Sequence, residues 1–425
     1  MEMYFYKGNE NIFEKTTSTG SEDDSSQDIN LKKIQDSFLK VLDNKNLSFL
    51  IGSGCSSFEE EGSQIGIPVM APLTKEFYDS TAFKNYKDDL KTKLKIDVKD
   101  DKFSTNLELF LSTLHSLSFC LSKQSGSDEN ESLEKVQNLI REARNFLLEK
   151  CLNENNSKSE KDKPSIDKPL LDLYKEFYRK LLTRNSTLPR LNIFTTNYDL
   201  YSERAMDDLG IHYVNGFTGG IQKFFNPAIF NYALAEKMDL SQSKWSVIDN
   251  FFYLYKLHGS VNWIENNTDN KLFKVKEIQD PTLEKLKNEK TIMIHPTPLK
   301  YNVSLGSPYS DLFREFQRKL MSNNNILVTI GYSFSDEHIN NLIFQAFTIP
   351  SFRLIVIGEP KSGSEIEKLK NLNDSRIWII GGKNEDGNKI HYFKDFVKYA
   401  MPDLTAEDLD NKMEQTIRNL KELLG

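Results

Sequence analysis

The stretch Leu47-Ser48-Phe49-Leu50-Ile51-Gly52-Ser53-Gly54-Cys55-Ser56 decides the fold of this chain. Its first half is a short apolar run typical of a buried strand, and that run passes directly into a glycine turn. Strand and glycine turn together open a nucleotide-binding α/β unit, because glycine lacks the Cβ that would keep a phosphate away from the backbone amides. The turn that contains Gly52, Ser53, Gly54 and Ser56 is therefore one candidate for binding a pyrophosphate. A plain strand-to-helix turn is the alternative, and Ser57 in place of a third glycine argues against an ordinary dehydrogenase fingerprint.

Apolar runs of strand length recur along the chain and alternate with amphipathic helices. The further strands are predicted at Leu191–Thr195, Tyr253–Leu257, Thr291–Ile294, Ile326–Ile330, Leu354–Ile357 and Ile377–Ile380. The helices of this pattern are predicted at Leu31–Leu42, Leu200–Leu209, Asp311–Met321 and Glu337–Ala346. This alternation indicates an α/β fold with a Rossmann-like, doubly wound and mostly parallel sheet.

Four regions follow from the composition of the segments. Residues 1–30 are expected to be a disordered tail, because Thr16–Asp28 is rich in Ser, Asp and Glu. Residues 31–73 and 190–400 are predicted to form the α/β domain. Residues 74–189 are predicted to be a helical insertion, with helices at Leu107–Leu121, Leu133–Leu152 and Leu170–Leu182 and loops at Lys123–Ser132 and Asn153–Lys168. Residues 401–425 are predicted to be a C-terminal helix, centred on Ala406–Leu424.

Composition excludes several classes of protein. The chain has 425 residues and a net charge of −7, so it has no overall basic field to attract nucleic acid. Its three cysteines are far apart in the sequence, which argues against a thiolate zinc site and a disulfide framework and favours a reducing, cytoplasmic location. No apolar run is long enough to cross a membrane, and the first residues do not resemble a signal peptide.

A polar segment, Thr195-Thr196-Asn197-Tyr198-Asp199, stands at the carboxyl end of the second strand. Open α/β sheets bind ligands at such strand ends. The amide of Asn197 can donate and accept a hydrogen bond at once, which suits a ribose hydroxyl or a water molecule. Thr195 and Asp199 are predicted to contact the same ligand. The alternative is that Asn197 or Asp199 caps the following helix, with Asp199 the stronger candidate.

His258 follows the strand Tyr253–Leu257 and precedes Gly259. A lone histidine is usually structural, but its position at another strand end sets His258 apart from the other five histidines. Histidine titrates near neutral pH, so His258 is a candidate general base.

Two further strand ends and one loop carry candidate ligand-binding residues. Gly331 and Ser333 lie in the turn after Ile326–Ile330, where Ser335 or Asp336 is expected to cap the next helix. Glu359 follows Leu354–Ile357 and is a candidate for the ribose hydroxyls of an adenosine. Pro68 stiffens the loop beyond the first glycine turn.

Taken in chain order, these motifs resemble those of the sirtuin family. The resemblance rests on the glycine turn, Gly66-Ile67-Pro68, the segment 195–199, His258-Gly259 and the turn after Ile330. Three stretches, Phe194–Leu200, Asn215-Gly216-Phe217 and Leu254–Ser260, are most similar to the sirtuin-like subunit of bacterial antiphage systems that pair it with a HerA-like hexameric ATPase.

The resemblance implies an enzyme that uses NAD as its substrate. Asn197 and His258 would be its catalytic pair, Ser333 would contact NAD, and Glu359 would reach the adenosine ribose. The implied reaction is hydrolysis of the nicotinamide–ribose bond to nicotinamide and ADP-ribose. The implied role is antiphage defence by abortive infection through NAD depletion, gated by oligomerisation or by a HerA-like partner.

Two departures from deacetylating sirtuins argue against an activity on acyl-lysine. Those enzymes carry a four-cysteine zinc module, whereas this chain has three cysteines. Val69 and Met70 also stand where a phenylalanine and an arginine would follow Gly-Ile-Pro. The remaining alternatives are a sensor that binds NAD or ADP-ribose, and a zinc-free protein deacylase or ADP-ribosyltransferase. The acidic balance disfavours a nucleic-acid enzyme.

Overall fold

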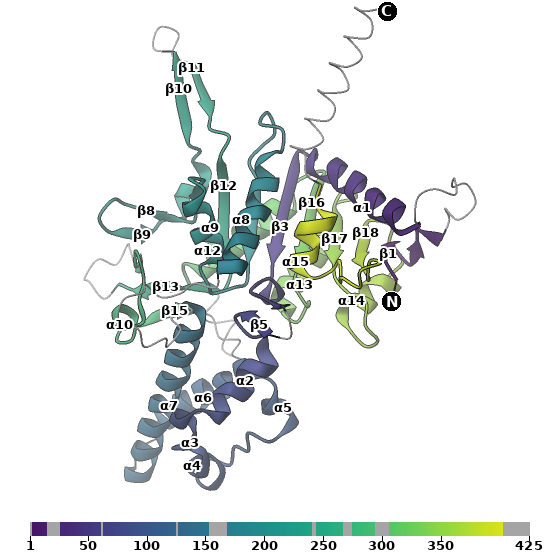
Figure 1. The fold of residues 1–425 in the computed structure, drawn as a ribbon. Helices are drawn as coiled ribbons and strands as arrows, with labels where there is room; N and C mark the ends of the chain where they lie inside the picture. The colour runs from purple at the N-terminus through teal and green to yellow at the C-terminus, as the bar shows by residue number, and fades with distance from the viewer. Residues whose placement is uncertain are drawn as a thin grey trace, which may run out of the picture.

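The computed structural model describes residues 2–14, 26–60, 63–124, 126–152, 168–239, 244–266, 274–293 and 306–402. An α/β part surrounds a large sheet, and a helical part made of α2 to α7 lies at one end of it (Figure 1). No helix in these ranges is long and apolar enough to cross a membrane. The predicted C-terminal helix and the greater part of the predicted loop Asn153–Lys168 lie outside the described residues.

The large sheet has the strand order β2-β1-β18-β17-β16-β3-β6-β12-β7. All neighbours from β18 to β7 pair in parallel, whereas β1 and β2 are antiparallel additions at one edge. In chain order the strands span Tyr4–Lys7 (β1), Glu10–Asn11 (β2), Asn46–Ile51 (β3), Asn192–Thr195 (β6), His212–Val214 (β7), Phe251–Lys256 (β12), Asn325–Ile330 (β16), Arg353–Ile357 (β17) and Ile377–Gly381 (β18). This arrangement fits the predicted Rossmann-like α/β fold.

Helices cover both faces of the sheet because successive strand residues point to opposite sides. In β3, Phe49 and Ile51 belong to one hydrophobic core and Leu50 to the other. The first core is covered by α1 (Ser26–Leu42), α8 (Lys168–Leu182), α9 (Tyr201–Asp208) and α15 (Phe393–Asp395). The second is covered by α12 (Tyr309–Leu320), α13 (Glu337–Ala346) and α14 (Glu365–Asn371).

The connections place a topological switch point at β3. From β3 the chain continues to β6 on one side, and after β12 it crosses to β16 on the other side. The loops that follow β3 and β16 therefore leave the sheet in opposite directions. In open α/β sheets this divergence opens a crevice at the carboxyl ends of the strands, where ligands bind.

The prediction of a disordered tail over residues 1–30 is wrong at both of its ends. Strand β1 pairs with β18, Phe5 packs edge-on against Trp378 with ring centres 5.2 Å apart, and the Tyr4 hydroxyl donates to the Gly358 carbonyl at 3.0 Å. Helix α1 begins at Ser26. The sequence did not indicate β1, because this short strand is stabilised by a partner more than 350 residues away in the chain.

The predicted boundaries of the helical insertion, 74–189, are also wrong at both ends. The helical part already begins with α2 at Met70. Helix α8 does not belong to it, because Leu170, Tyr174 and Phe177 pack into the core of the large sheet. Helical periodicity marks the buried stripe of α8 but does not say which surface covers that stripe.

The helical part has its own core. It contains α2 (Met70–Asp79), α3 (Thr81–Lys84), α4 (Lys87–Thr92), α5 (Asp101–Ser104), α6 (Leu107–Leu121) and α7 (Ser127–Leu152). The predicted loop Lys123–Ser132 is wrong from Ser127 onward, because α7 starts there with Asp128 and Glu129 in a first turn that favours acidic residues. The far end of α7 packs through Leu148 and Leu152 against the α/β part.

A second sheet lies beside the large one, with the strand order β15-β13-β14-β9-β8. Its strands are β8 (Phe217–Thr218), β9 (Lys223–Phe225), β13 (Gly259–Glu265), β14 (Val275–Glu277) and β15 (Thr291–Met293). The run Thr291–Ile294 is thus a strand as predicted over its described residues, but it pairs with β13 and is not part of the parallel sheet. Two short hairpins, β4 (Ser57–Glu60) with β5 (Ser63–Gly66) and β10 (Ala235–Asp239) with β11 (Lys244–Val247), complete the strands.

Candidate active site

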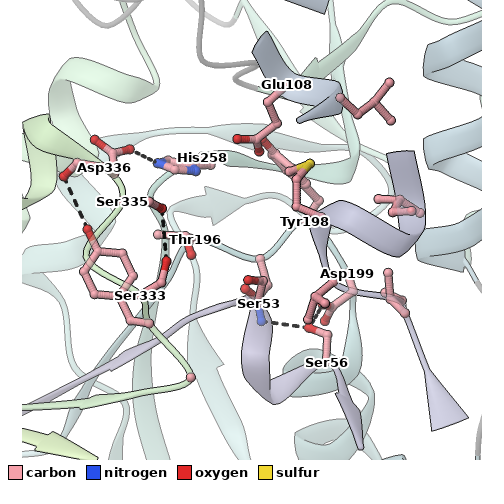
Figure 2. Close-up of a pocket in the computed structure, with 18 of the residues that line it drawn as sticks. Ser53, Ser56, Glu108, Thr196, Tyr198, Asp199, His258, Ser333, Ser335 and Asp336 are labelled. Carbon is pink, nitrogen blue, oxygen red and sulfur yellow. Dashed lines mark hydrogen bonds and ion pairs between the residues drawn. The ribbon is translucent and has the colours of Figure 1, made fainter. Parts of the chain in front are cut away.

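A cavity of about 740 Å³ lies at the switch point of the large sheet. Its floor is formed by the segments that follow β3, β6, β12 and β16, and its opposite wall by α2, α6 and α7 of the helical part (Figures 1 and 2). Eight of the residues predicted from the sequence line it: Ser53, Ser56, Pro68, Asn197, Asp199, His258, Gly331 and Ser333. Its volume is in the range of pockets that enclose cofactor-sized ligands.

The two glycine turns at the switch point pack backbone against backbone. A Cβ on Gly52 would lie 2.4 Å from the Gly331 carbonyl oxygen, and one on Gly54 would lie 2.9 Å from the Gly331 Cα. The amides of Gly52 and Gly54 donate to Ile330 and Gly331. Gly52 and Gly54 do not line the cavity. The absence of a Cβ at these two positions lets the turn after β3 pack closely against the turn after β16.

Asn197 is held rigidly with one atom unpaired. Its Nδ2 donates to the Gly52 carbonyl at 3.0 Å and to Ser56 Oγ at 2.9 Å. Because a carbonyl oxygen can only accept, this fixes the orientation of the amide. Oδ1 is buried and has no hydrogen-bond partner among the described residues, although Asn197 lines the cavity. An unpaired buried acceptor is costly, so a donor from a ligand or a water molecule would be bound here.

The neighbours of Asn197 position it. Ser56 Oγ donates to Asp199 Oδ2 at 2.6 Å, and Asp199 Oδ1 accepts from the Tyr201 amide at the start of α9. The Thr195 hydroxyl accepts from the Asn197 amide at 3.0 Å, and Thr195 does not line the cavity. Asp199 thus binds the amide of the first residue of α9, although the predicted cap position itself is taken by Leu200.

A buried cation lies under this segment. Lys256, which is 1% exposed, donates to the carbonyls of Tyr198 and Asp199 and lies 3.0 Å from Glu203 Oε1. Burial raises the pKa of Glu203, and the neighbouring Lys256 partly offsets that shift. Lys256 therefore connects the end of β12, shortly before His258, to the loop that contains Asn197.

His258 is paired with a carboxylate that the sequence suggested only as a helix cap. Its Nε2 lies 2.9 Å from Asp336 Oδ2 (Figure 2), while Asp336 Oδ1 accepts from the amides of His338 and Ile339 at the start of α13. When Nε2 donates to the Asp336 carboxylate, Nδ1 is the ring nitrogen that can accept a proton. A base oriented by a third group is the arrangement of many hydrolytic sites.

Hydrogen bonds to the side chain of Asn340 on α13 hold the turn that follows β16. The Tyr332 hydroxyl donates to Asn340 Oδ1 at 3.0 Å, and Asn340 Nδ2 donates to the Phe334 carbonyl at 2.7 Å. The side chains of Ser333 and Ser335 are hydrogen-bonded to each other at 3.1 Å at the cavity (Figure 2). Both hydroxyls are exposed, so a ligand at the cavity floor could form hydrogen bonds with them without any rearrangement of the turn.

The sequence missed the contribution of the helical part. Asn106, Leu107 and Glu108 at the start of α6 line the cavity, together with Leu147 and Cys151 of α7. Burial raises the pKa of the Tyr198 hydroxyl well above its usual value, with a further contribution from Glu108, so this phenol stays protonated. No strand-end pattern marks these residues, because they come from the segment predicted to be an insertion.

Glu359 is the predicted site residue that lies apart from the others. It does not line the cavity, and its Oε2 lies 3.5 Å from both Lys361 Nζ and His391 Nε2. Nδ1 of His391 accepts from the Gly382 amide at 3.3 Å. Burial lowers the pKa of His391 to about 4 and outweighs the opposite effect of Glu359, so the ring is neutral near pH 7.

Because the pKa of His391 is lowered in the folded protein, we expect the free energy of unfolding to depend on pH. An unfolded histidine has a pKa of about 6.5, so the unfolded chain binds the proton first and the free energy of unfolding falls as the pH drops from about 6.5 to about 4. We expect His391 to account for about 2 kcal/mol of the difference between pH 7 and pH 5. Urea unfolding of the wild type and of His391→Gln at both pH values measures it. An equal loss of stability in both proteins would contradict the assignment.

The described residues contain no group of three or more His, Cys, Asp or Glu side chains placed to hold a metal ion. The polar groups at the cavity include a histidine oriented by a carboxylate, an unpaired amide oxygen and several hydroxyls.

The chain is similar to a known protein family over part of its length. The model of the SIR2-like domain matches residues 191–377, which include Asn197, His258 and Asp336 but neither the first glycine turn nor the helical part. No curated protein is similar enough to the chain to count as a match. The match indicates a SIR2-like domain over this part of the chain, which suggests an NAD-related activity in general.

Proposed function

We propose that this protein is an NAD glycohydrolase, which cleaves the bond between nicotinamide and ribose. The observation that carries the proposal is the pairing of two groups at one cavity: the unpaired Oδ1 of Asn197 and the His258–Asp336 pair. A SIR2-like domain over residues 191–377 supports NAD as the substrate. A pure binding module would not need a histidine that a carboxylate orients as a base.

The reaction needs no general acid. The C1′–N1 bond breaks with its electron pair going to the pyridinium nitrogen, so nicotinamide leaves as a neutral molecule. The ribose carbon becomes cationic, as in glycoside hydrolysis. Asn197 Oδ1 accepts a hydrogen bond from a ribose hydroxyl or from the attacking water, and His258 takes the proton of that water. The products are nicotinamide, ADP-ribose and one proton.

Two alternatives would use the same site. An NAD or ADP-ribose sensor would bind the nucleotide without turnover. A zinc-free deacylase or ADP-ribosyltransferase would need a second substrate, and the metal module of deacetylating sirtuins cannot be built from three cysteines, of which Cys55 and Cys151 are buried. Hydrolysis needs only water and is the simplest use of the site.

The biological proposal is antiphage defence by NAD depletion in the cytoplasm. An unregulated NADase harms its own cell, so we propose that activity is gated by self-association or by a HerA-like ATPase. The resemblance of Phe194–Leu200 and Leu254–Ser260 to the sirtuin-like subunits of such systems supports this part.

The test is the appearance of products with no acceptor protein present. Purified protein is incubated with NAD, alone and with a candidate HerA-like ATPase, and nicotinamide and ADP-ribose are quantified by chromatography. We expect both products in equal amounts. The same preparation of Asn197→Ala controls for contaminating NADases. NAD that binds but stays intact in every mixture would favour the sensor, and release only with an acyl-lysine peptide would favour the deacylase.

A further inference from the structure

The cavity has an unusual balance of charge. Its lining includes the carboxylates of Glu108, Asp199, Asp336 and Glu337, and no lysine or arginine is among the described residues that line it. Carboxylates around an enclosed space favour a positively charged group within it and disfavour a negative one. The unpaired Asn197 Oδ1, on a side chain that is 8% exposed, independently indicates that a ligand is bound at this place.

Three of these carboxylates lie on the floor, and two of them are already engaged. Asp199 accepts from Ser56 and from the Tyr201 amide, and Asp336 is shared between His258 and the first turn of α13. Glu337 is exposed in the first turn of α13. Glu108 differs from all three, because it comes from the helical wall opposite the strand ends.

Glu108 is held in place by the packing of α6. Asn106 caps the helix by accepting from the Leu109 amide at 2.9 Å. The Leu107 side chain is 1% exposed, and its amide donates to Thr74 Oγ1 at 2.9 Å, which ties α6 to α2. Glu108 lies in the first turn of α6, where the helix dipole favours a negatively charged side chain.

Figure 2 shows Glu108 and His258 at the same end of the cavity, where they come from opposite walls. Glu108 is also near enough to Tyr198 to contribute to the raised pKa of its hydroxyl. The rings of Tyr198 and His258 have centres 6.4 Å apart. A nicotinamide ring whose ribose is bound at Asn197 and whose C1′ is reached from His258 would therefore lie close to the Glu108 carboxylate. The oxidised ring is a cation, whereas the reduced ring is neutral and otherwise nearly identical.

We propose that Glu108 is a specificity-determining residue that selects the oxidised, positively charged nicotinamide ring over the reduced one. The helical part thereby contributes to the substrate site, because its wall adds a fourth carboxylate to the three on the floor. The inference rests on the proposed function for the identity of the ligand, but it concerns binding and not turnover.

Binding is measured by calorimetry in the His258→Ala background, where hydrolysis is slow. We expect NAD to bind more tightly than NADH, and Glu108→Gln to reduce that preference about 10-fold by weakening NAD alone. Glu134→Gln is the matched control, since it removes the same charge from an exposed position of α7 in the same helical part. It should leave the preference unchanged.

The possible outcomes separate this inference from the proposed function. Equal weakening of NAD and NADH by Glu108→Gln would show a merely structural role and would overturn the inference, even if the wild type hydrolyses NAD. A charge preference that depends on Glu108 in a protein that never releases nicotinamide would support the inference and overturn the hydrolase. Failure of NAD to bind any variant would overturn both.

Discussion

Replacement of His258 by alanine is expected to lower kcat for nicotinamide release by about 10²- to 10⁴-fold, the usual contribution of a positioned general base. The fold should survive, since the ring is 12% exposed and lies at the wall of the cavity and not in a hydrophobic core. KM should change little, because the proton leaves only after NAD is bound. Steady-state kinetics of nicotinamide release, with circular dichroism to verify folding, measure both parameters.

Asp336 and His258 are expected to act as one unit. Asp336→Asn keeps a cap for α13 but no longer provides a carboxylate to orient the ring, so it should lower kcat by a similar order of magnitude. The double variant should then be hardly worse than His258→Ala alone. His212→Ala is the control, because this exposed histidine lies on β7 at the sheet edge and away from the cavity lining. Additive losses in the double variant would argue against the pair.

Gly52→Ala is expected to lower the free energy of unfolding by about 3 kcal/mol or more. Its φ of −107° and ψ of −179° suit any residue, so the constraint is space and not backbone conformation. The new Cβ would lie 2.4 Å from the Gly331 carbonyl oxygen and 2.7 Å from the Tyr332 Cα. Both contacts are to backbone, so no side chain can rotate away and β3 must separate from β16.

The same substitution should abolish activity in any protein that still folds, because the Gly52 carbonyl is an acceptor for Asn197 Nδ2. Gly220→Ala is the matched control, since nothing lies within 4 Å of the Cβ that it would add. Urea denaturation should place the midpoint of Gly52→Ala well below that of the wild type and that of Gly220→Ala close to it. Equal midpoints for the two variants would contradict the close approach.

The strands of the parallel sheet could be predicted because each is a continuous apolar run. Leu47–Ile51 lies within β3, and Ile326–Ile330 and Ile377–Ile380 lie within β16 and β18. A strand buried on both faces needs apolar residues at every position, and a glycine or polar turn marks its end. Elements stabilised by a distant partner gave no such signal. Strand β1 depends on β18, and the partner of α8 is decided by the sheet onto which it packs.

The sequence by itself determined the order of the strands along the chain and the polar residues at their carboxyl ends, which include Asn197 and His258. It could do so because hydrophobic periodicity and turn residues are local properties of the chain. Only the tertiary structure decided that Asp336 orients His258, that Gly52 fits against Gly331, and that Glu108 faces the strand ends from the helical part. The first two contacts join residues that lie 78 and 279 positions apart in the chain, and the third joins two different parts of the fold. Such pairings depend on how the layers of the fold pack together, and no pattern within a single segment encodes them.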